Sequence, residues 1–224
     1  NITHVSTKID PIDDIETINL ELQLADLESL NNKKSSIEKK LKANDKDAKF
    51  QYEILDKILN IFNNENKLTF DNFIDSEISF INTLNLISLK PTMYICNVDE
   101  ASIHSGNKLT AEVLNFAKTN NNSVVMISAS IESQIANLEN EEEKYEFLRE
   151  LKLDETTLNK VIKSGYNLLD LINYFTCGPK ETRSWTIKKN TYAPQAAGKI
   201  HSDFEKGFIR AETVSYSDYL ENNG

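Results

Sequence analysis

Glycine, proline, cysteine and methionine are all scarce in this chain of 224 residues, which contains 6, 4, 2 and 2 of them respectively. The glycines form no phosphate-binding loop, because the single Gly-Lys pair, Gly198-Lys199, is followed by Ile200 and lacks the earlier glycine. The cysteines form no Cys-x-x-Cys pair, and the histidines have no partners at metal-ligand spacing, which argues against a zinc site. The spacing of these residues indicates no catalytic triad either.

Long apolar runs are absent as well, since none approaches the roughly 18 residues that a membrane-spanning helix needs. No secretory signal is visible at the N-terminus. Cys96 and Cys177 each lie in an apolar, strand-like run, which favours buried thiols in a reducing compartment over a disulfide. We therefore expect a soluble, cytoplasmic protein without a membrane partner. The missing initiator Met further suggests an interior piece of a longer protein.

The net charge of -10 is unevenly distributed along the chain. Residues 1–150 carry 15 Lys and Arg against 26 Asp and Glu, whereas residues 151–224 carry 10 against 9. The acidic total argues against general nucleic-acid binding, and we expect no DNA partner. The balanced second part leaves room for a local basic patch.

The first part of the chain has the pattern of two helices. Asp13 and Asp14 suit a helix N-terminus, and apolar residues then recur at helical spacing to Leu41. Written as a heptad repeat, this segment has Leu20, Leu27, Lys34 and Leu41 at position a and Gln23, Leu30 and Ile37 at position d. The repeat is imperfect, because Lys34 and Gln23 are polar. A polar turn at 44–47 begins a second helix to Phe62, which predicts an antiparallel hairpin. It is either a solvated structural element or an arm that binds a partner.

The middle of the chain alternates helices and strands. We predict a helix over 70–89, a strand over 93–96 buried on both faces, and a helix over 109–117. A second apolar strand follows at 123–127, with another helix from about Ile131. Short connections between these elements indicate a parallel α/β layer.

The last part of the chain changes in composition. Residues 139–166 have a helical, acidic pattern, with a cap at Asp154 and an end at Gly165. Extended segments over 168–177 and 182–187, a helix from Pro194 and a strand over 208–214 follow. These elements predict a small α+β domain.

Polar residues follow both predicted parallel strands. Asn97-Val98-Asp99-Glu100 ends the first, and Ser128-Ala129-Ser130 ends the second. Ligands of open α/β sheets bind beyond the carboxyl ends of the strands, although a polar turn after a core strand would look the same. GTP-binding folds have Asn-Lys-x-Asp and Ser-Ala-x at two such successive strand ends.

The departures from that pattern favour adenine over guanine. The usual Asp accepts hydrogen bonds from guanine N1–H and the exocyclic amine, donors that adenine lacks at those positions. Glu100 moves the carboxylate by one methylene, and Val98 replaces the Lys. The Asn97 amide can still pair with the N6 and N7 edge of adenine.

Several motifs together resemble those of the YchF-type Obg-like ATPases. The resemblance is carried by Lys90-Pro-Thr-Met-Tyr-Ile-Cys-Asn-Val-Asp-Glu100, by residues 10–16 and 128–132, and most densely by residues 193–211, which are similar to the family's TGS domain. It covers essentially the whole chain.

The resemblance implies a partial P-loop G domain of α/β class, interrupted by an α-helical hairpin and followed by a small α+β, ubiquitin-like TGS domain. The implied boundaries are 1–12 and 68–150 for the G domain, 13–67 for the hairpin, 151–166 for a helical connector and 167–224 for a TGS domain incomplete at its C-terminus.

The resemblance also implies a ribosome-associated enzyme that hydrolyses ATP in preference to GTP, with Mg²⁺ as cofactor of the longer protein. Asn97 would contact adenine, Val98 and Glu100 would mark the altered selectivity, and Ser128 with Ala129 would close the base pocket. Because the phosphate loop is absent, we expect this chain alone to be inactive, with no catalytic or metal-binding residue of its own.

A basic segment offers a second candidate site. Residues 180–210 include seven basic and three acidic residues. Three aromatic residues, Trp185, Tyr192 and His201, are interspersed with the basic ones. Such a mixture suits RNA phosphates and stacked bases, although it could be a solvated surface over a buried Trp185. The alternative function is therefore a non-catalytic RNA- or ribosome-binding module, whose candidate contacts are Lys180, Arg183, Lys188, Lys189, Lys199 and Arg210.

Overall fold

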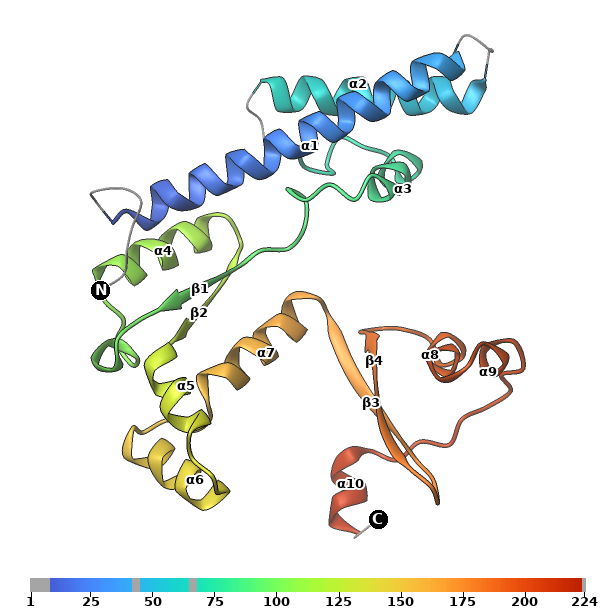
Figure 1. Ribbon diagram of the computed structural model, residues 1–224. Coiled ribbons are helices and arrows are strands. Elements are labelled where there is room, and N and C mark those ends of the chain that lie inside the picture. The colour runs from blue at the N-terminus through green and yellow to red at the C-terminus, as the bar shows by residue number, and fades with distance from the viewer. Residues whose placement is uncertain (1–8, 42–44, 65–67, 223–224) are drawn as a thin grey trace. The chain divides into compact units, whose positions relative to one another are not determined.

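The computed structural model describes residues 9–41, 45–64 and 68–222. Contacts divide the chain into two compact units, Asn1–Ser130 and Ile131–Gly224, and the described residues of each form helices and one pair of strands (Figure 1). The domain boundaries expected from the sequence stay predictions, and residues 1–8 of the first expected segment lie outside the described residues. Among the described residues, no helix has the length and hydropathy needed to span a membrane.

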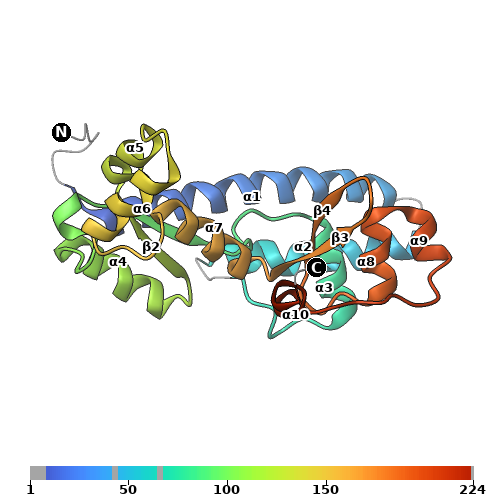
Figure 2. The same cartoon turned by 90° about the horizontal axis from the view of Figure 1, so that it is seen from below.

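In the first unit, α1 (Pro11–Leu41) lies beside α2 (Lys46–Asn63) along its second half (Figures 1 and 2). The Asp10 carboxylate accepts the Asp13 N–H at 3.4 Å, so the helix begins before the expected start at Asp13. Leu20, assigned to the heptad seam, is 56% exposed, so the buried seam does not include it. The shared core consists of Leu30, Ile37, Ala48, Ile54, Leu55, Ile58, Leu59 and Phe62.

The long helix predicted over 70–89 is wrong, because α3 covers only Asp75–Thr83. Asn85 adopts a φ of 52°, a left-handed conformation that ends a helix. The N–H groups of Ile87 and Ser88 then donate to the two carboxylate oxygens of Asp26, at 2.9 and 2.8 Å. Asp26 is 3% exposed, so a buried carboxylate fixes this segment to α1.

The parallel strand pair predicted for the first unit is confirmed. β1 (Met93–Asn97) pairs with β2 (Ser123–Ile127) in parallel, and α4 (Lys108–Thr119) connects them after a short 3-10 helix at Glu100–Ser102. The expectation that β1 is buried on both faces is wrong, since Ile95 is 48% exposed. In the described part of the chain β1 pairs only with β2, so its other edge lies open.

The second unit begins with helices. α5 (Ala129–Ala136) starts at the division between the units, and α6 (Glu141–Glu150) and α7 (Thr157–Leu168) follow. The expected cap at Asp154 is wrong, because the Thr156 side chain accepts from the Asn159 N–H. The helix also passes through Gly165, since a single glycine inside a helix costs only about 1 kcal/mol.

The rest of the second unit consists of a two-stranded antiparallel sheet and the short helices that follow it. β3 (Leu171–Cys177) pairs with β4 (Thr182–Lys188), and α8 (Ala193–Ile200), α9 (Ser202–Lys206) and α10 (Tyr216–Glu221) follow.

The strand predicted over 208–214 is wrong, because these residues have no regular structure. Ile209 is 90% exposed and Val214 67% exposed. Within the described residues no strand lies against this segment, so its backbone has no partner with which to form a ladder.

Candidate functional site

The two parallel strands bring both predicted polar motifs to one edge of the sheet. Asn97 is the last residue of β1 and is in register with Ile127, the last residue of β2. The Val98 N–H donates to the Ile127 carbonyl at 2.9 Å and extends the pairing by one residue. Beyond it, the Asn97 Oδ1 accepts the Ala129 N–H at 3.0 Å. The motifs are therefore joined directly, 32 positions apart in the sequence.

A second contact joins the motifs one step further out. The Ser130 hydroxyl donates to the Glu100 carboxylate at 2.7 Å. Between these contacts, Asp99 accepts the Ser102 N–H at 2.9 Å and caps the 3-10 helix. The loop after β1 is thus held by its own side chains. We did not predict Ser130 as a residue of this site. Its position directly after Ser128-Ala129 could have indicated it.

The structure divides the five predicted base-site residues into two groups. Asn97, Glu100 and Ala129 are exposed at the sheet edge. Val98 is 8% exposed and Ser128 is fully buried. The buried pair can shape the edge from inside, but only the exposed group can touch a ligand at the surface.

Asn97 supplies the chemistry of this edge. One lone pair of its Oδ1 is used by the Ala129 N–H, which fixes the orientation of the amide. Its Nδ2 has no hydrogen-bond acceptor among the described residues. Two N–H donors therefore remain for a ligand, together with the second lone pair of the oxygen.

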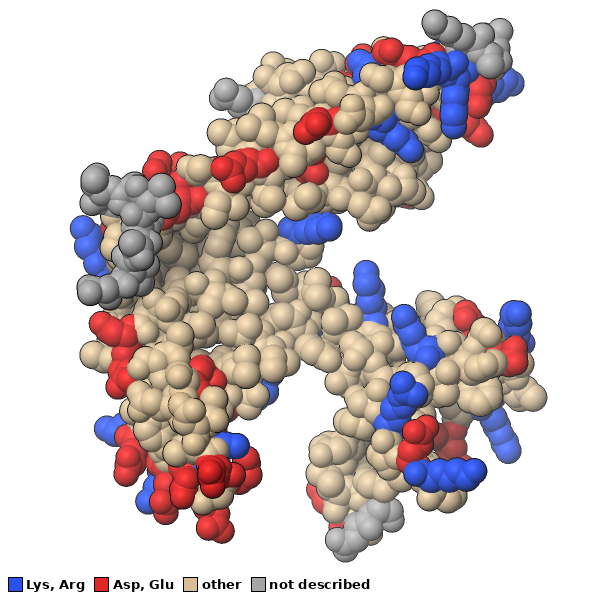
Figure 3. Space-filling view, viewed as in Figure 1, with Lys and Arg blue, Asp and Glu red and all other residues tan. Residues whose placement is uncertain are grey.

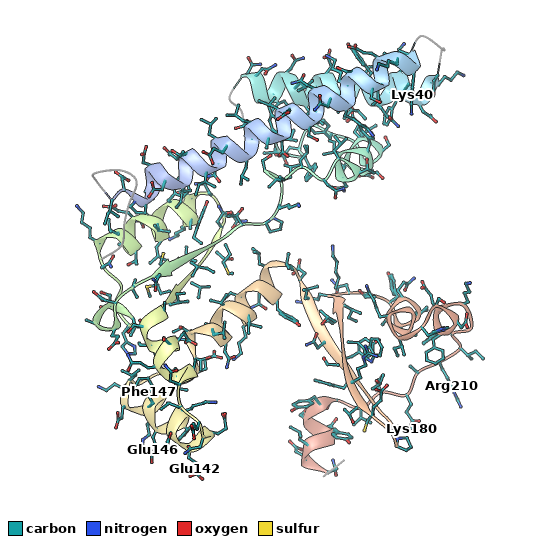
Figure 4. All side chains as sticks on the ribbon, in the orientation of Figure 1. Lys40, Glu142, Glu146, Phe147, Lys180 and Arg210 are labelled. Atoms are coloured by element: carbon teal, nitrogen blue, oxygen red, sulfur yellow. The ribbon has the colours of Figure 1, made fainter. Side chains whose placement is uncertain are left out.

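The six predicted basic residues are all exposed, and none forms an ion pair among the described residues. They lie in the β3–β4 turn, in β4, directly after β4, in α8 and in the segment after α9; in that order these residues are Lys180, Arg183 and Lys188, Lys189, Lys199, and Arg210. Figure 3 shows Lys and Arg side chains over this part of the chain, and Figure 4 labels Lys180 and Arg210. Not all of them lie on one face. Because side chains alternate along a strand, Arg183 and Lys188 point to opposite faces of β4.

Arg183 belongs to an ordered group with Trp185. The guanidinium carbon lies 4.4 Å from the centroid of the Trp185 ring. The ring is half-buried, and its Nε1 donates to the Thr176 hydroxyl at 2.9 Å. Tyr174, which is opposite Trp185 on β3, donates its hydroxyl hydrogen to the Ala196 carbonyl at 2.8 Å. Trp185 is thus neither fully buried nor a freely rotating ring.

Both cysteines are unpaired, but they differ in environment. Cys96 is half-buried, and burial raises the pKa of its thiol. The expectation of a buried thiol is wrong for Cys177, which is exposed at the end of β3. Hydrogen bonds with the hydroxyls of Thr182, at 3.4 Å, and Tyr219, at 3.6 Å, lower the pKa of the Cys177 thiol.

Known proteins match this chain along its whole length. The model of the family YchF-GTPase_C, described as a protein of unknown function (DUF933), matches residues 171–224. The chain is 48% identical to the ribosome-binding ATPase YchF of Bacillus subtilis (strain 168), with 100% of the chain and 62% of that protein covered. It is 46% identical to the protein of the same name from Escherichia coli O157:H7, with 100% and 61% covered. It is 37% identical to Obg-like ATPase 1 of Gallus gallus, with 99% and 57% covered.

The fold agrees with these sequence relatives. The solved structure of the Schizosaccharomyces pombe YchF GTPase matches with a TM-score of 0.80 at 33% identity, covering 99% of this chain and 60% of that one. The chain spans only about 60% of the length of the relatives it matches. The likeness in sequence and in fold to the YchF-type Obg-like ATPases extends from one end of the chain to the other, so the chain is homologous to a part of these proteins.

Proposed function

We propose that this chain is part of a ribosome-associated ATPase that hydrolyses ATP in preference to GTP, and that Asn97 contacts the adenine base. The exposed Asn97 amide at the joined strand ends carries the proposal. Its Oδ1 is held by the Ala129 N–H, and its Nδ2 lacks an acceptor in the described part of the chain. The Nδ2 would donate to N7 of adenine, and the remaining lone pair of Oδ1 would accept from N6.

The other predicted residues have supporting roles in this proposal. Glu100, whose carboxylate accepts from the Ser130 hydroxyl at 2.7 Å, would not supply the two acceptors that guanine requires. Val98 and Ser128 would support the base site from its buried side, and the exposed Ala129 would lie beside the base.

ATP chemistry also requires groups that hold the phosphates and Mg²⁺. The sequence contains no Gly-rich loop ending in Lys-Ser/Thr. The described residues bring together no group of three or more His, Cys, Asp or Glu side chains that could hold a metal ion. We therefore assign only the base contact to this chain and assign phosphate binding, Mg²⁺ and hydrolysis to the whole protein. The chain alone is proposed to be inactive.

The test of base recognition uses the whole protein with Asn97→Ala. We expect ATP affinity to fall about tenfold, because two hydrogen bonds to the base are lost. Asn115→Ala, in an exposed position on α4, is the matched control and should leave ATP affinity unchanged. Unchanged affinity in the Asn97 variant would refute the proposed contact.

We further propose that this chain contacts RNA of the ribosome through its second unit, in which residues 167–224 form a TGS-like domain. The ribosome-binding names of the bacterial relatives support the partner. The unpaired, exposed basic residues and the Arg183–Trp185 pair support the chemistry, since phosphates attract the cations and a stacked ring can accept a base. The cytoplasm, where ribosomes work, is the proposed location.

Salt dependence and a pair of substitutions test the RNA contact. Association of the chain with ribosomes should weaken steeply as salt rises. Because Arg183 and Lys188 lie on opposite faces of β4, Arg183→Gln and Lys188→Gln should weaken association unequally. Association unaffected by salt and by both substitutions would exclude this function without bearing on Asn97.

A further inference from the structure

The Asn97 amide separates adenine from guanine only in part. Both bases have the acceptor N7, so a hydrogen bond from the Asn97 Nδ2 is available to either of them. Only the Oδ1 contact differs, because adenine has an amine where guanine has a carbonyl. Guanine alone also presents N1–H and exocyclic-amine donors, and Glu100 stands at the position whose carboxylate reads them in the GTP-binding pattern. A residue that controls the Glu100 carboxylate would therefore act on guanine and not on adenine.

A hydrogen bond from the other motif engages that carboxylate. The Ser130 hydroxyl donates to Oε1 of Glu100 at 2.7 Å, and both side chains are exposed at the strand ends. The two residues are 30 positions apart, so this bond is not a local turn contact. A hydrogen bond to an ionised carboxylate is stronger than one between neutral groups.

The backbone at each end of this bond is fixed. Glu100 begins the short 3-10 helix, which the Asp99 carboxylate caps. Ser130 is the second residue of α5, and the residue before it donates its N–H to the Asn97 Oδ1 at 3.0 Å. The first turn of a helix is also a favourable place for a carboxylate. The bond from Ser130 therefore sets the direction of the Glu100 side chain.

That direction matters for guanine. A carboxylate that accepts from both N1–H and the amine must turn both of its oxygens to the base. Because Oε1 of Glu100 is hydrogen-bonded to Ser130, guanine would meet at most one oxygen unless that bond breaks. Adenine has no donor at either position and makes no such demand.

We propose that Ser130 is a specificity-determining residue, which acts by withholding the Glu100 carboxylate from guanine. This inference rests on the proposed base site at the strand ends and adds a second source of selectivity to it. Asn97 favours adenine by a direct contact, whereas Ser130 disfavours guanine through a hydrogen bond that guanine would have to break. Ser130 is a positioning residue, since it acts through Glu100 and not on the base.

The length of the Glu100 side chain belongs to the same arrangement. An Asp, as in the GTP-binding pattern, is shorter by one methylene, and a bond of 2.7 Å has no slack to absorb that loss. Glu100 thus supplies the reach and Ser130 the anchor. Glu100→Asp and Ser130→Ala should consequently act on one interaction, so their effects on GTP affinity should not add.

The test measures the dissociation constants of GTP and ATP for the whole protein, by displacement of a fluorescent ATP analogue. Ser130→Ala should raise GTP affinity relative to ATP about fivefold, because the carboxylate no longer leaves a hydrogen bond to reach guanine. Ser130→Thr keeps the hydroxyl and should keep the original ratio. Ser133→Ala, exposed on the same helix, is the matched control and should change neither constant.

A base analogue and a second background separate this role from a structural one. Inosine 5′-triphosphate has the N1–H of guanine without its amine, so Ser130→Ala should improve its binding less than that of GTP. In the Glu100→Ala background no carboxylate remains, so Ser130→Ala should leave the ratio of the two constants unchanged. A merely structural bond would instead alter ATP and GTP affinity by the same factor.

The inference is overturned if Ser130→Ala leaves the GTP to ATP ratio unchanged, or if the change persists in the Glu100→Ala background. Asn97→Ala reports separately on the adenine contact, through ATP affinity. An unchanged ATP affinity in that variant would refute the proposed function, and an unchanged ratio in Ser130→Ala would refute this inference, so the two failures are distinguishable.

Discussion

Replacement of Asp26 by alanine should destabilise the first unit more than its position on a solvated helix suggests. Its carboxylate is 3% exposed and accepts two backbone N–H groups, of Ile87 at 2.9 Å and of Ser88 at 2.8 Å. The substitution leaves both donors unsatisfied, at roughly 1–3 kcal/mol each. We therefore expect Asp26→Ala to lower the free energy of unfolding by about 2–6 kcal/mol.

The assay for Asp26→Ala is urea unfolding followed by far-ultraviolet circular dichroism, with amide hydrogen exchange as the local measurement. Trp185 lies in the second unit, so its fluorescence would not report this change. The Ile87 and Ser88 amides should exchange faster in the variant, because they lose their acceptor. Glu28→Ala, exposed on the same helix, should cost less than about 0.5 kcal/mol. A loss below 1 kcal/mol with unchanged exchange would refute the reasoning.

Three further predictions concern packing and reactivity. Ile58→Ala, at a fully buried position between α1 and α2, should cost about 2–5 kcal/mol in urea unfolding. Thr157→Val removes one of the two hydrogen bonds that hold α7 to α5, so it should lower the free energy of unfolding by about 1 kcal/mol. An unchanged free energy of unfolding would show that the hydroxyl contact does not stabilise the fold. Iodoacetamide should alkylate Cys177 at lower pH than Cys96, because the Thr182 hydrogen bond lowers the pKa of Cys177 and burial raises that of Cys96; mass spectrometry showing the reverse order would contradict this.

Elements set by local pattern were predictable from the sequence. The parallel strands at 93–97 and 123–127 were found because their apolar runs are bounded by polar residues, and α8 because Pro194 suits the first turn of a helix. The polar residues after the strands met at one edge for the same topological reason.

Features that depend on distant contacts were not predictable. The periodicity from 70 to 89 continued past Asn85, but α3 ends at Thr83 and Asn85 is left-handed. The buried Asp26, 61 residues before Ile87, then holds the backbone that follows in a non-helical path. Residues 208–214 read as a strand, but a strand needs a partner, and none lies beside them among the described residues. The outward direction of Asn97 and the burial of Val98 likewise follow from the β1–β2 register, not from the motif.

The most direct test of the central claim is a competition between ATP and GTP for the whole protein, measured as the ratio of their dissociation constants. Adenine recognition by Asn97, with Glu100 in place of a guanine-reading Asp, predicts that ATP binds at least about tenfold more tightly. The Asn97→Ala variant should lose most of that preference. A whole protein that binds GTP tenfold more tightly than ATP would contradict the account.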